Sequence, residues 1–472
     1  MHNSKLFHEL KTLSIKELKG FEKYLNSPFF NSNDTLKLLF SIIENFHPTY
    51  VHKDIERELL FKKLFPKDTF DEKKIRYAVS DLTKLLEDYL LYTEFKKDSI
   101  LNKHFLLKSL SERNIEKYFL QTLEETSLSQ EKSQYRNIDY YYHQYLLEEN
   151  SYLFTSKTQN RALDTSLQNV VDNLELFYIS KSLRYYCEII NRQNILTVDY
   201  NLHFLNEIMH YIDSKGFDNV PVIIIYYKIL QTLTSNDNEQ HYYDLIDLLE
   251  QHESKFTRAE IHDMYTFAQN YCIRKINSGK TDYMQILYEL YKILLKKDLL
   301  IEGDVLPQWY YKNIATLAIR LEDFEWAKKF IYDYKNKLSP EHQENDFTFA
   351  LAILHFSMKE YKKTLSFLIN VEYTDVFYHL DSKSLLLRTY YELNDWEPLL
   401  SLIITFKTYL KRNKLISSHY GQTYFNFVNI VSKLSQFKMG KNINIDEVKK
   451  EMENIKQIAN IVWLEKKVAE LS

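Results

Sequence analysis

Glycine and proline are scarce in this chain, and their scarcity limits the folds that it can adopt. The 472 residues include 6 Gly and 7 Pro, whereas these two residues together usually make up roughly 12% of a protein. β-Sandwiches and doubly wound α/β folds need many tight turns, and Gly and Pro are the residues that most often form such turns. Helices joined by short polar loops need few of them. The sequence therefore predicts an all-α protein.

Length and charge narrow the possible classes further. A single compact core rarely serves more than roughly 250–300 residues, so we expect several domains or one long repeat array. The formal net charge is −4, and the chain has no acidic or basic tail. This argues against nonspecific electrostatic binding to the phosphates of nucleic acid. The first 30 residues lack the apolar core of a secretory signal, and the longest apolar run, residues 220–227, is much shorter than a membrane span of ~20 residues.

We therefore expect a soluble, cytoplasmic protein that does not enter a membrane. Two cysteines in a chain of this length do not form a disulfide framework. Both lie in apolar, helix-like sequence, so Cys187 and Cys272 are expected to be buried free thiols.

The first 95 residues predict a separate helical head of about four helices. Ser14 and Glu17 have the spacing of a capping box, and Thr69 and Glu72 repeat that spacing before a long helix. Basic residues cluster around the start of this long helix, at Lys62, Lys63, Lys67, Lys73, Lys74 and Arg76. A DNA-binding head is one interpretation. Because acidic residues interrupt the cluster, we favour a structural cap or docking module.

A repeat is visible from about residue 240 onward. Each instance has an aromatic residue three positions before an aliphatic or small residue, and an acidic residue usually precedes the aromatic one. The instances are Tyr243 with Ile246, Tyr283 with Ile286, Phe324 with Ala327, Tyr361 with Thr364, and Trp396 with Leu399. Successive aromatic residues are 40, 41, 37 and 35 positions apart, which is the period of helical-hairpin arrays. We interpret them as residues that pack one hairpin against another.

This pattern resembles the tetratricopeptide-repeat family. In that family a small residue lies in the first helix of each hairpin, and here Ala315 and Ala352 stand nine positions before the aromatic residues of two repeats. Leu387 departs from the pattern in the next repeat. The resemblance covers roughly residues 300–412, and 240–300 more weakly. It implies an irregular tetratricopeptide-like α-solenoid of helical hairpins. The layout of the whole chain is also similar to that of uncharacterised bacterial proteins.

These observations divide the chain into four parts. We predict an N-terminal helical head in 1–95, a helical connecting region in 96–240, tetratricopeptide-like repeats in 241–440 and a C-terminal capping helix in 441–472. The capping helix is predicted from an apolar stripe with alternating spacings of four and three, formed by Val448, Met452, Ile455, Ala459 and Val462. A repeat array needs such a cap with a polar outer face, and a dimerisation helix is the alternative.

No sequence motif indicates catalysis or cofactor binding. The six glycines are too scattered for a phosphate-binding loop. Two Glu-x-x-His pairs, Glu44 with His47 and Glu207 with His210, have a spacing that di-iron helical bundles use. The pairs are far apart and lack assignable further ligands. We therefore expect a protein that is not an enzyme and binds no cofactor or metal.

The leading functional hypothesis is a helical-repeat scaffold that binds a protein or peptide partner. The alternative is a nucleic-acid-associated regulator that uses either the N-terminal head or a basic face of the repeats. That face would be formed by Lys407, Lys411, Arg412 and Lys414.

Overall fold

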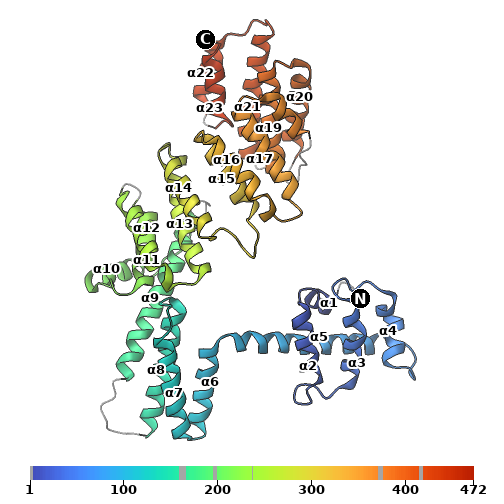
Figure 1. Ribbon diagram of the computed structural model, residues 1–472, viewed down its shortest axis with the longest axis vertical. Coiled ribbons are helices and arrows are strands. Elements are labelled where there is room, and N and C mark those ends of the chain that lie inside the picture. The colour runs from blue at the N-terminus through green and yellow to red at the C-terminus, as the bar shows by residue number, and fades with distance from the viewer. Residues whose placement is uncertain are drawn as a thin grey trace. The chain divides into compact units, whose positions relative to one another are not determined.

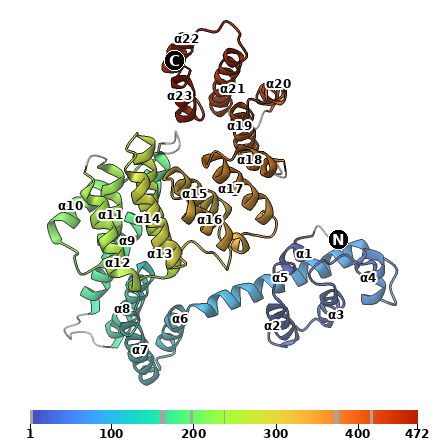
Figure 2. The ribbon, with the colours of Figure 1, turned by 45° about the horizontal axis from the view of Figure 1, so that its top comes forward.

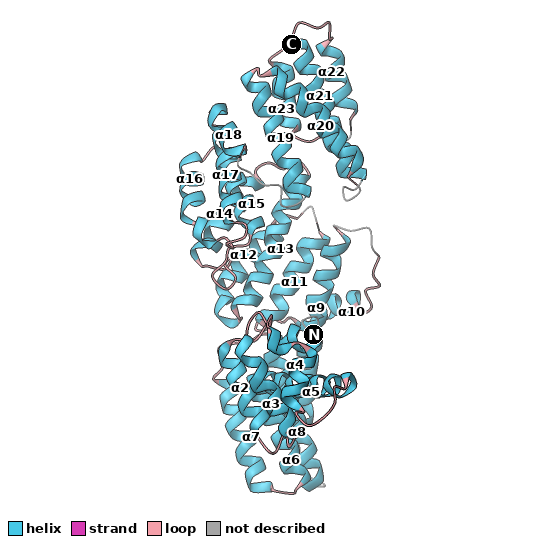
Figure 3. Cartoon of the chain, turned by 90° about the vertical axis from the view of Figure 1, so that its right-hand side faces the viewer, coloured by secondary structure: helices cyan, strands magenta, loops and turns pink. Residues whose placement is uncertain are grey.

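The computed structural model describes residues 4–158, 166–194, 199–235, 238–369, 376–413, 418–455 and 457–471. Every regular element in these residues is a helix (Figure 3), and their only extended pairing is an isolated bridge between Glu302 and Val305. The prediction of an all-α protein is confirmed. The chain forms two compact units, Met1–Ser182 and Leu183–Ser472, which we name unit 1 and unit 2. The predicted division into four parts is finer than this and stays a prediction.

Unit 1 begins with four short helices that pack around the first part of a long one (Figure 1). Its elements are α1 (Lys5–Leu10), α2 (Ile15–Asn26), α3 (Asp34–Ile43), η1 (Glu44–Phe46), η2 (Lys53–Ile55), α4 (Arg57–Leu64), α5 (Glu72–Lys97), α6 (Ser99–Glu112), α7 (Glu116–Glu131) and α8 (Ile138–Thr158). The next helix, α9 (Ser166–Gln193), runs across the boundary with unit 2.

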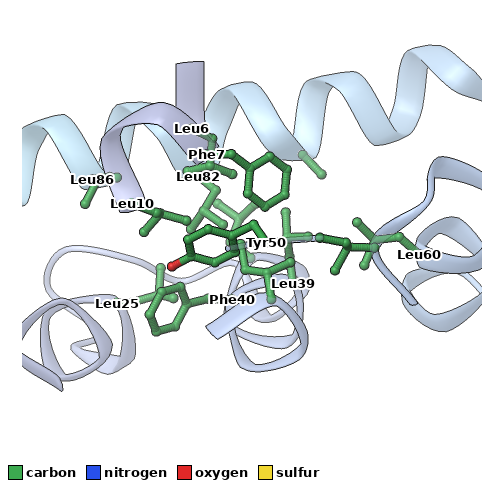
Figure 4. Close-up of a cluster of buried hydrophobic side chains, with 14 of the residues drawn as sticks. Leu6, Phe7, Leu10, Leu25, Leu39, Phe40, Tyr50, Leu60, Leu82 and Leu86 are labelled. Atoms are coloured by element: carbon green, nitrogen blue, oxygen red, sulfur yellow. The ribbon is translucent and has the colours of Figure 1, made fainter. Parts of the chain in front are cut away.

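The head has a hydrophobic core of its own, built from residues between Leu6 and Tyr89. Tyr50 lies at its centre among Phe7, Leu10 and Leu39 (Figure 4). The rings of Phe7 and Tyr50 are 5.3 Å apart. All the residues of this core come from α1–α5 and their connections, so the head buries its apolar side chains without help from later helices.

Local capping explains where the head helices begin. Ser14 accepts a hydrogen bond from the Glu17 amide, and the Glu17 carboxylate accepts one from the Ser14 amide over 2.8 Å, which confirms the predicted capping box. The prediction of Thr69 as the cap of the long helix is wrong. The cap is Asp71, which directly precedes the helix and places a negative charge at its positive end.

After the head, α6, α7 and α8 of unit 1 form a small group of three helices. α6 packs on α7 and α8, and α7 packs on α8. Leu107, Phe119, Leu147 and Phe154 form the buried cluster between them. The rings of Phe119 and Phe154 stack with their centres 4.0 Å apart.

Unit 2 is a succession of helices in which neighbours in sequence pack together from α11 onward. Its elements after α9 are α10 (Leu205–Lys215), α11 (Pro221–Thr234), α12 (Gln240–His252), η3 (Glu253–Lys255), α13 (Arg258–Asn277), α14 (Tyr283–Lys296), α15 (Gln308–Arg320), α16 (Phe324–Asp333), η4 (Lys335–Lys337), α17 (Gln343–Ser357), α18 (Tyr361–Leu368), α19 (Val376–Leu393), α20 (Trp396–Arg412), α21 (Ser418–Lys438), α22 (Ile445–Asn454) and α23 (Ile461–Ala469).

Four helices of unit 2 begin at the aromatic residues that the repeat predicts. They are α14, α16, α18 and α20, which start at Tyr283, Phe324, Tyr361 and Trp396. The fifth instance differs, because α12 begins three residues before Tyr243. The acidic residue before each of the four aromatics occupies the N-cap position, where a negative charge is favoured.

One turn geometry recurs in the connections of unit 2, and it directly precedes α16, α18 and α20. Glu322, Lys359 and Asn394 each adopt a left-handed backbone, with φ of 61°, 60° and 55°. The amide of the residue after each turn donates to the carbonyl five positions earlier, over 2.8–3.0 Å. This is the hydrogen bond that ends many helices, and glycine usually occupies the left-handed position. Gly279 and Gly440 occupy it in two other turns of unit 2, whereas a larger residue occupies it in the three turns named above.

The C-terminal segment contains two helices instead of the single capping helix expected from the apolar stripe. α22 ends at Asn454, where Ile455 is extended, and Asn460 adopts a left-handed backbone with φ of 54° before α23 begins. Asparagine tolerates this conformation better than most residues. Val462, a member of the predicted stripe, is 76% exposed. The spacing of the stripe continues through the break, so spacing alone does not detect it.

Candidate functional site

A groove of about 490 Å³ lies within unit 2. Its walls come from α13, α14, α15, α17 and α19, with Asn460 from the connection before α23. α15 packs on α17 and α17 on α19, whereas α13 packs on α14, which lies beside α15 (Figure 2). The groove therefore runs along α13, α15, α17 and α19, with α14 contributing to one wall. Its volume lies within the range of roughly 300–1,000 Å³ that is typical of binding pockets.

Buried apolar side chains form much of the groove wall. Leu287 and Tyr291 come from α14, Leu317 from α15, Phe349 from α17 and Leu385 from α19. Leu287 and Tyr291 are four positions apart on one face of α14, so buried residues of that face also reach the groove. A ligand here would remove apolar surface from water.

One ion pair crosses the groove from α15 to α19. The Lys312 ammonium contacts the Asp381 carboxylate over 2.5 Å, and the Tyr424 hydroxyl of α21 donates to the second Asp381 oxygen over 2.7 Å. Asp381 is the only carboxylate among the described lining residues, which also include three cations: Lys312, Arg320 and Arg388. The lining therefore has an excess of positive charge.

Arg388 of α19 is the most unusual residue of the groove. Burial lowers the pKa of its guanidinium to about 10, so the group stays protonated at neutral pH. The guanidinium lies over the ring of Phe356, 4.8 Å from its centre. Its Nε is buried and has no hydrogen-bond partner in the described part of the chain. Part of the side chain nevertheless keeps access to solvent, which is consistent with its place in the groove lining.

Amide side chains add hydrogen-bonding groups to the lining. Asn277 at the end of α13 and Asn313 on α15 are exposed. Asn460 donates from its amide to the hydroxyl of Ser384 on α19, over 2.6 Å. Each amide side chain can both donate and accept hydrogen bonds, as a peptide backbone does.

The six residues predicted to pack the hairpins lie elsewhere. Tyr283 and Ala327 are buried, Phe324, Tyr361 and Trp396 are half-buried, and none of these five lines the groove.

Tyr243, the sixth, requires a correction. It is 45% exposed, and the preceding Tyr242, 2% exposed, makes the inward contact by stacking on Tyr271 with ring centres 5.1 Å apart. Both neighbours are tyrosines, so the sequence pattern did not distinguish the inner ring from the outer one.

The other predicted sites can be located directly. Cys187 and Cys272 are free and buried, as predicted. Glu44 and His47 lie in and just after η1, and Glu207 and His210 both lie on α10. Within the described ranges, no group of three or more His, Cys, Asp or Glu side chains could hold a metal ion.

The basic residues proposed for nucleic-acid binding are only partly engaged within the described part of the chain. In the head, Lys63 pairs with Asp54 and Lys74 with Asp68, whereas the other four cations of the cluster form no ion pair with a described residue. On α20, Lys407 and Lys411 approach the ring of Phe425, 5.9 and 5.5 Å from its centre. Burial, together with Lys411 and Lys433, lowers the pKa of Lys407. Lys414 lies outside the described residues.

Comparison with known proteins provides no identification. No family model, curated protein or solved structure matches this chain significantly. Among the helices that the structure describes, none is long and apolar enough to cross a membrane.

Sequence reasoning did not identify the charged residues of the groove. Lys312, Arg320 and Arg388 come from two helices separated by more than fifty residues, and only the fold brings them together. One local signal was present. Arg388 directly follows three consecutive leucines on a helix, where a charged residue on an apolar face is unexpected.

Proposed function

We propose that unit 2 is a non-catalytic scaffold, an irregular α-solenoid of tetratricopeptide-like hairpins, whose groove binds a segment of a protein partner. The observation that carries this proposal is the composition of the groove. Buried apolar side chains such as Leu317 and Phe349 lie beside the exposed amides of Asn277 and Asn313. An extended peptide needs both, because its backbone needs hydrogen-bond partners and its side chains need apolar contacts.

The repeated features of the hairpins support the solenoid part of the proposal. Four successive second helices begin with an acidic N-cap residue and an aromatic residue. Three of the connections use the same left-handed turn. Repeats of this kind stack because one hairpin cannot bury its apolar face alone.

We do not propose the nucleic-acid alternative, because the formal net charge of the chain is −4 and two cations of the head cluster, Lys63 and Lys74, are paired with carboxylates. Binding to phosphates depends on cations that can exchange their counterions for the nucleic acid. A cation that already has an acidic partner contributes less to such binding.

A selection from random peptides displayed on phage, performed on the full-length protein, tests the proposal. We expect peptides that bind the wild type and lose binding to Thr316→Trp, because Thr316 lines the groove and the indole would occupy part of it. Lys328→Trp is the matched control, since Lys328 is exposed on α16 and is not among the lining residues. Affinities would be measured by fluorescence anisotropy.

Two results would contradict the proposal. One is that no selected peptide binds better than its scrambled version. The other is that Thr316→Trp and Lys328→Trp change affinity equally, because binding would then not depend on the groove.

A further inference from the structure

The groove contains two cations that lack an acidic partner within the described part of the chain. Arg388 lies deep in unit 2, and its buried Nε donates to no group there. Arg320, at the last turn of α15, is exposed on the same lining and makes no ion pair with a described residue. Both residues line the same groove, and the positive charge of Arg320 contributes to lowering the pKa of Arg388 after the larger effect of burial.

Two carboxylates that favour the charged form of Arg388 are already engaged by other groups. Asp381 and Glu392 both favour its charged form, yet neither forms an ion pair with it. Asp381 is held by Lys312 and Tyr424. Glu392 accepts hydrogen bonds from the Trp463 indole over 2.8 Å and from the Lys467 ammonium over 3.0 Å. The charge of Arg388 therefore remains available to a ligand.

Burying the Arg388 guanidinium without a counter-charge is energetically unfavourable, and a bound anion would reduce that cost. Removing a guanidinium from water is unfavourable unless a counter-charge and hydrogen bonds replace the water. Two like charges in a partly desolvated groove add repulsion. An oxyanion placed between them would lower both contributions and would satisfy the unpaired Nε of Arg388.

We propose that this part of the groove is an oxyanion subsite, in which Arg388 and Arg320 bind an acidic side chain of the partner segment. The proposal rests on the binding of a peptide segment in the groove, and it specifies the chemistry of that segment. The acidic group is a carboxylate or a phosphoryl group, since both present oxygens that match the guanidinium fork. The ring of Phe356 supports the Arg388 guanidinium and limits its rotation.

Peptides obtained from the random selection are the probes for this subsite. We expect one position to be enriched in Asp or Glu. Replacing that residue by Asn or Gln should weaken binding to the wild type by about 30-fold or more, as is usual when one member of a buried charge pair is removed. Binding to Arg388→Met should be weaker overall and should no longer distinguish the acid from the amide.

Further variants separate ligand binding from a structural role of the arginine. Arg388→Lys keeps the charge without the fork and should retain part of the discrimination. Arg320→Met changes an exposed residue and should reduce discrimination without affecting folding. Arg388→Met should melt at or above the wild-type temperature, because it removes a buried charge that has no partner. A structural role would instead lower the melting temperature.

Two further probes identify the source of the oxyanion. A peptide with phosphoserine at the selected position is compared with the Asp peptide, and tighter binding of either assigns the preferred group. Inorganic phosphate is tested separately by its effect on thermal melting of the wild type and of Arg320→Met. Stabilisation of the wild type alone would support the subsite even if no peptide binds, and only the proposed peptide-binding function would then fail.

The inference is overturned if peptides bind in the groove and the acid and amide forms bind the wild type equally. It is also overturned if no peptide binds and phosphate has the same effect on the wild type and on Arg320→Met.

Discussion

Lys467 on α23 connects the C-terminal end of the chain to α19, and its replacement tests how firmly that end is docked. The ammonium contacts Glu392 over 2.9 Å and Glu470 over 2.7 Å. The side chains of Lys467 and Glu392 are 8% and 11% exposed, whereas that of Glu470 is 46% exposed. The two acidic partners are therefore unequal, because only Glu392 depends on Lys467 to neutralise a buried charge.

Because the two partners are unequal, replacing Lys467 should destabilise the protein more than replacing Glu392. Among the described residues, Lys467→Met leaves Glu392 with the Trp463 indole as its remaining hydrogen-bond partner. We expect the free energy of unfolding to fall by about 3 kcal/mol, as for other broken buried pairs. Glu392→Gln leaves Lys467 paired with Glu470, so the free energy of unfolding should fall by about 1 kcal/mol. In the double variant the loss should be smaller than the sum of the two, because each single change leaves its partner unpaired.

Hydrogen exchange on the full-length protein measures this local stability. Peptides covering α23 should exchange on the order of 100-fold faster in Lys467→Met, since each 1.4 kcal/mol corresponds to a factor of ten. Peptides covering α2 in unit 1 provide the internal reference. Equal exchange of α23 in the wild type and both variants would refute the reasoning, because α23 would then not be held by this pair.

The stabilisation that Lys467 provides should depend on pH, because the ion pairs require a charged lysine and charged carboxylates. The hydrogen bond from Lys467 lowers the pKa of Glu470, so this contribution is present above the unfolded carboxyl pKa and is lost as pH falls through the lowered value. Burial alone would lower the pKa of Lys467, but hydrogen bonds to Glu470 and Glu392 raise it, so that contribution is lost only as pH rises through the raised value. The difference between the wild type and Lys467→Met should therefore be largest between roughly pH 5 and 10 and should shrink in acid.

Three further substitutions test other parts of the fold. Lys359→Gly should stabilise unit 2 by about 0.5–1 kcal/mol in calorimetry, because glycine adopts the left-handed backbone without strain. Gly20→Ala should destabilise the head by about 1–3 kcal/mol in urea unfolding, since the added methyl group would collide with the Tyr89 hydroxyl, and Tyr89→Phe should restore part of the loss. Tyr311→Phe should cost about 1–2 kcal/mol, because the buried hydroxyl donates to the Ile331 carbonyl over 2.7 Å, and an unchanged melting temperature would contradict this.

The sequence revealed those features of the fold that depend on neighbouring residues. The acidic and aromatic pairs at four helix starts were visible because an N-cap and the first turn lie next to each other in the chain. The capping box at Ser14 was visible for the same reason. Where two adjacent residues could serve equally, as with Tyr242 and Tyr243, the local pattern did not decide between them.

Features that depend on distant residues could not be read in this way. The groove joins residues of α13 to residues of α19, more than one hundred positions later in the chain, and no spacing rule connects them. The charge of Arg388 is informative only once Asp381 and Glu392 are known to be engaged by other groups. The break between α22 and α23 was missed because apolar spacing continues across it, whereas the backbone of Asn460 does not remain helical.

The self-contained core of the head has a consequence for synthesis of the chain. Its buried residues end at Tyr89, and the first groove residue, Ile273, is added 184 residues later. At 5–20 residues per second, the ribosome needs roughly 9–37 s to synthesise this stretch. The head can fold on the ribosome during that interval, before any groove residue is made. A nascent chain would then carry a folded head while the helices that line the groove are still being synthesised.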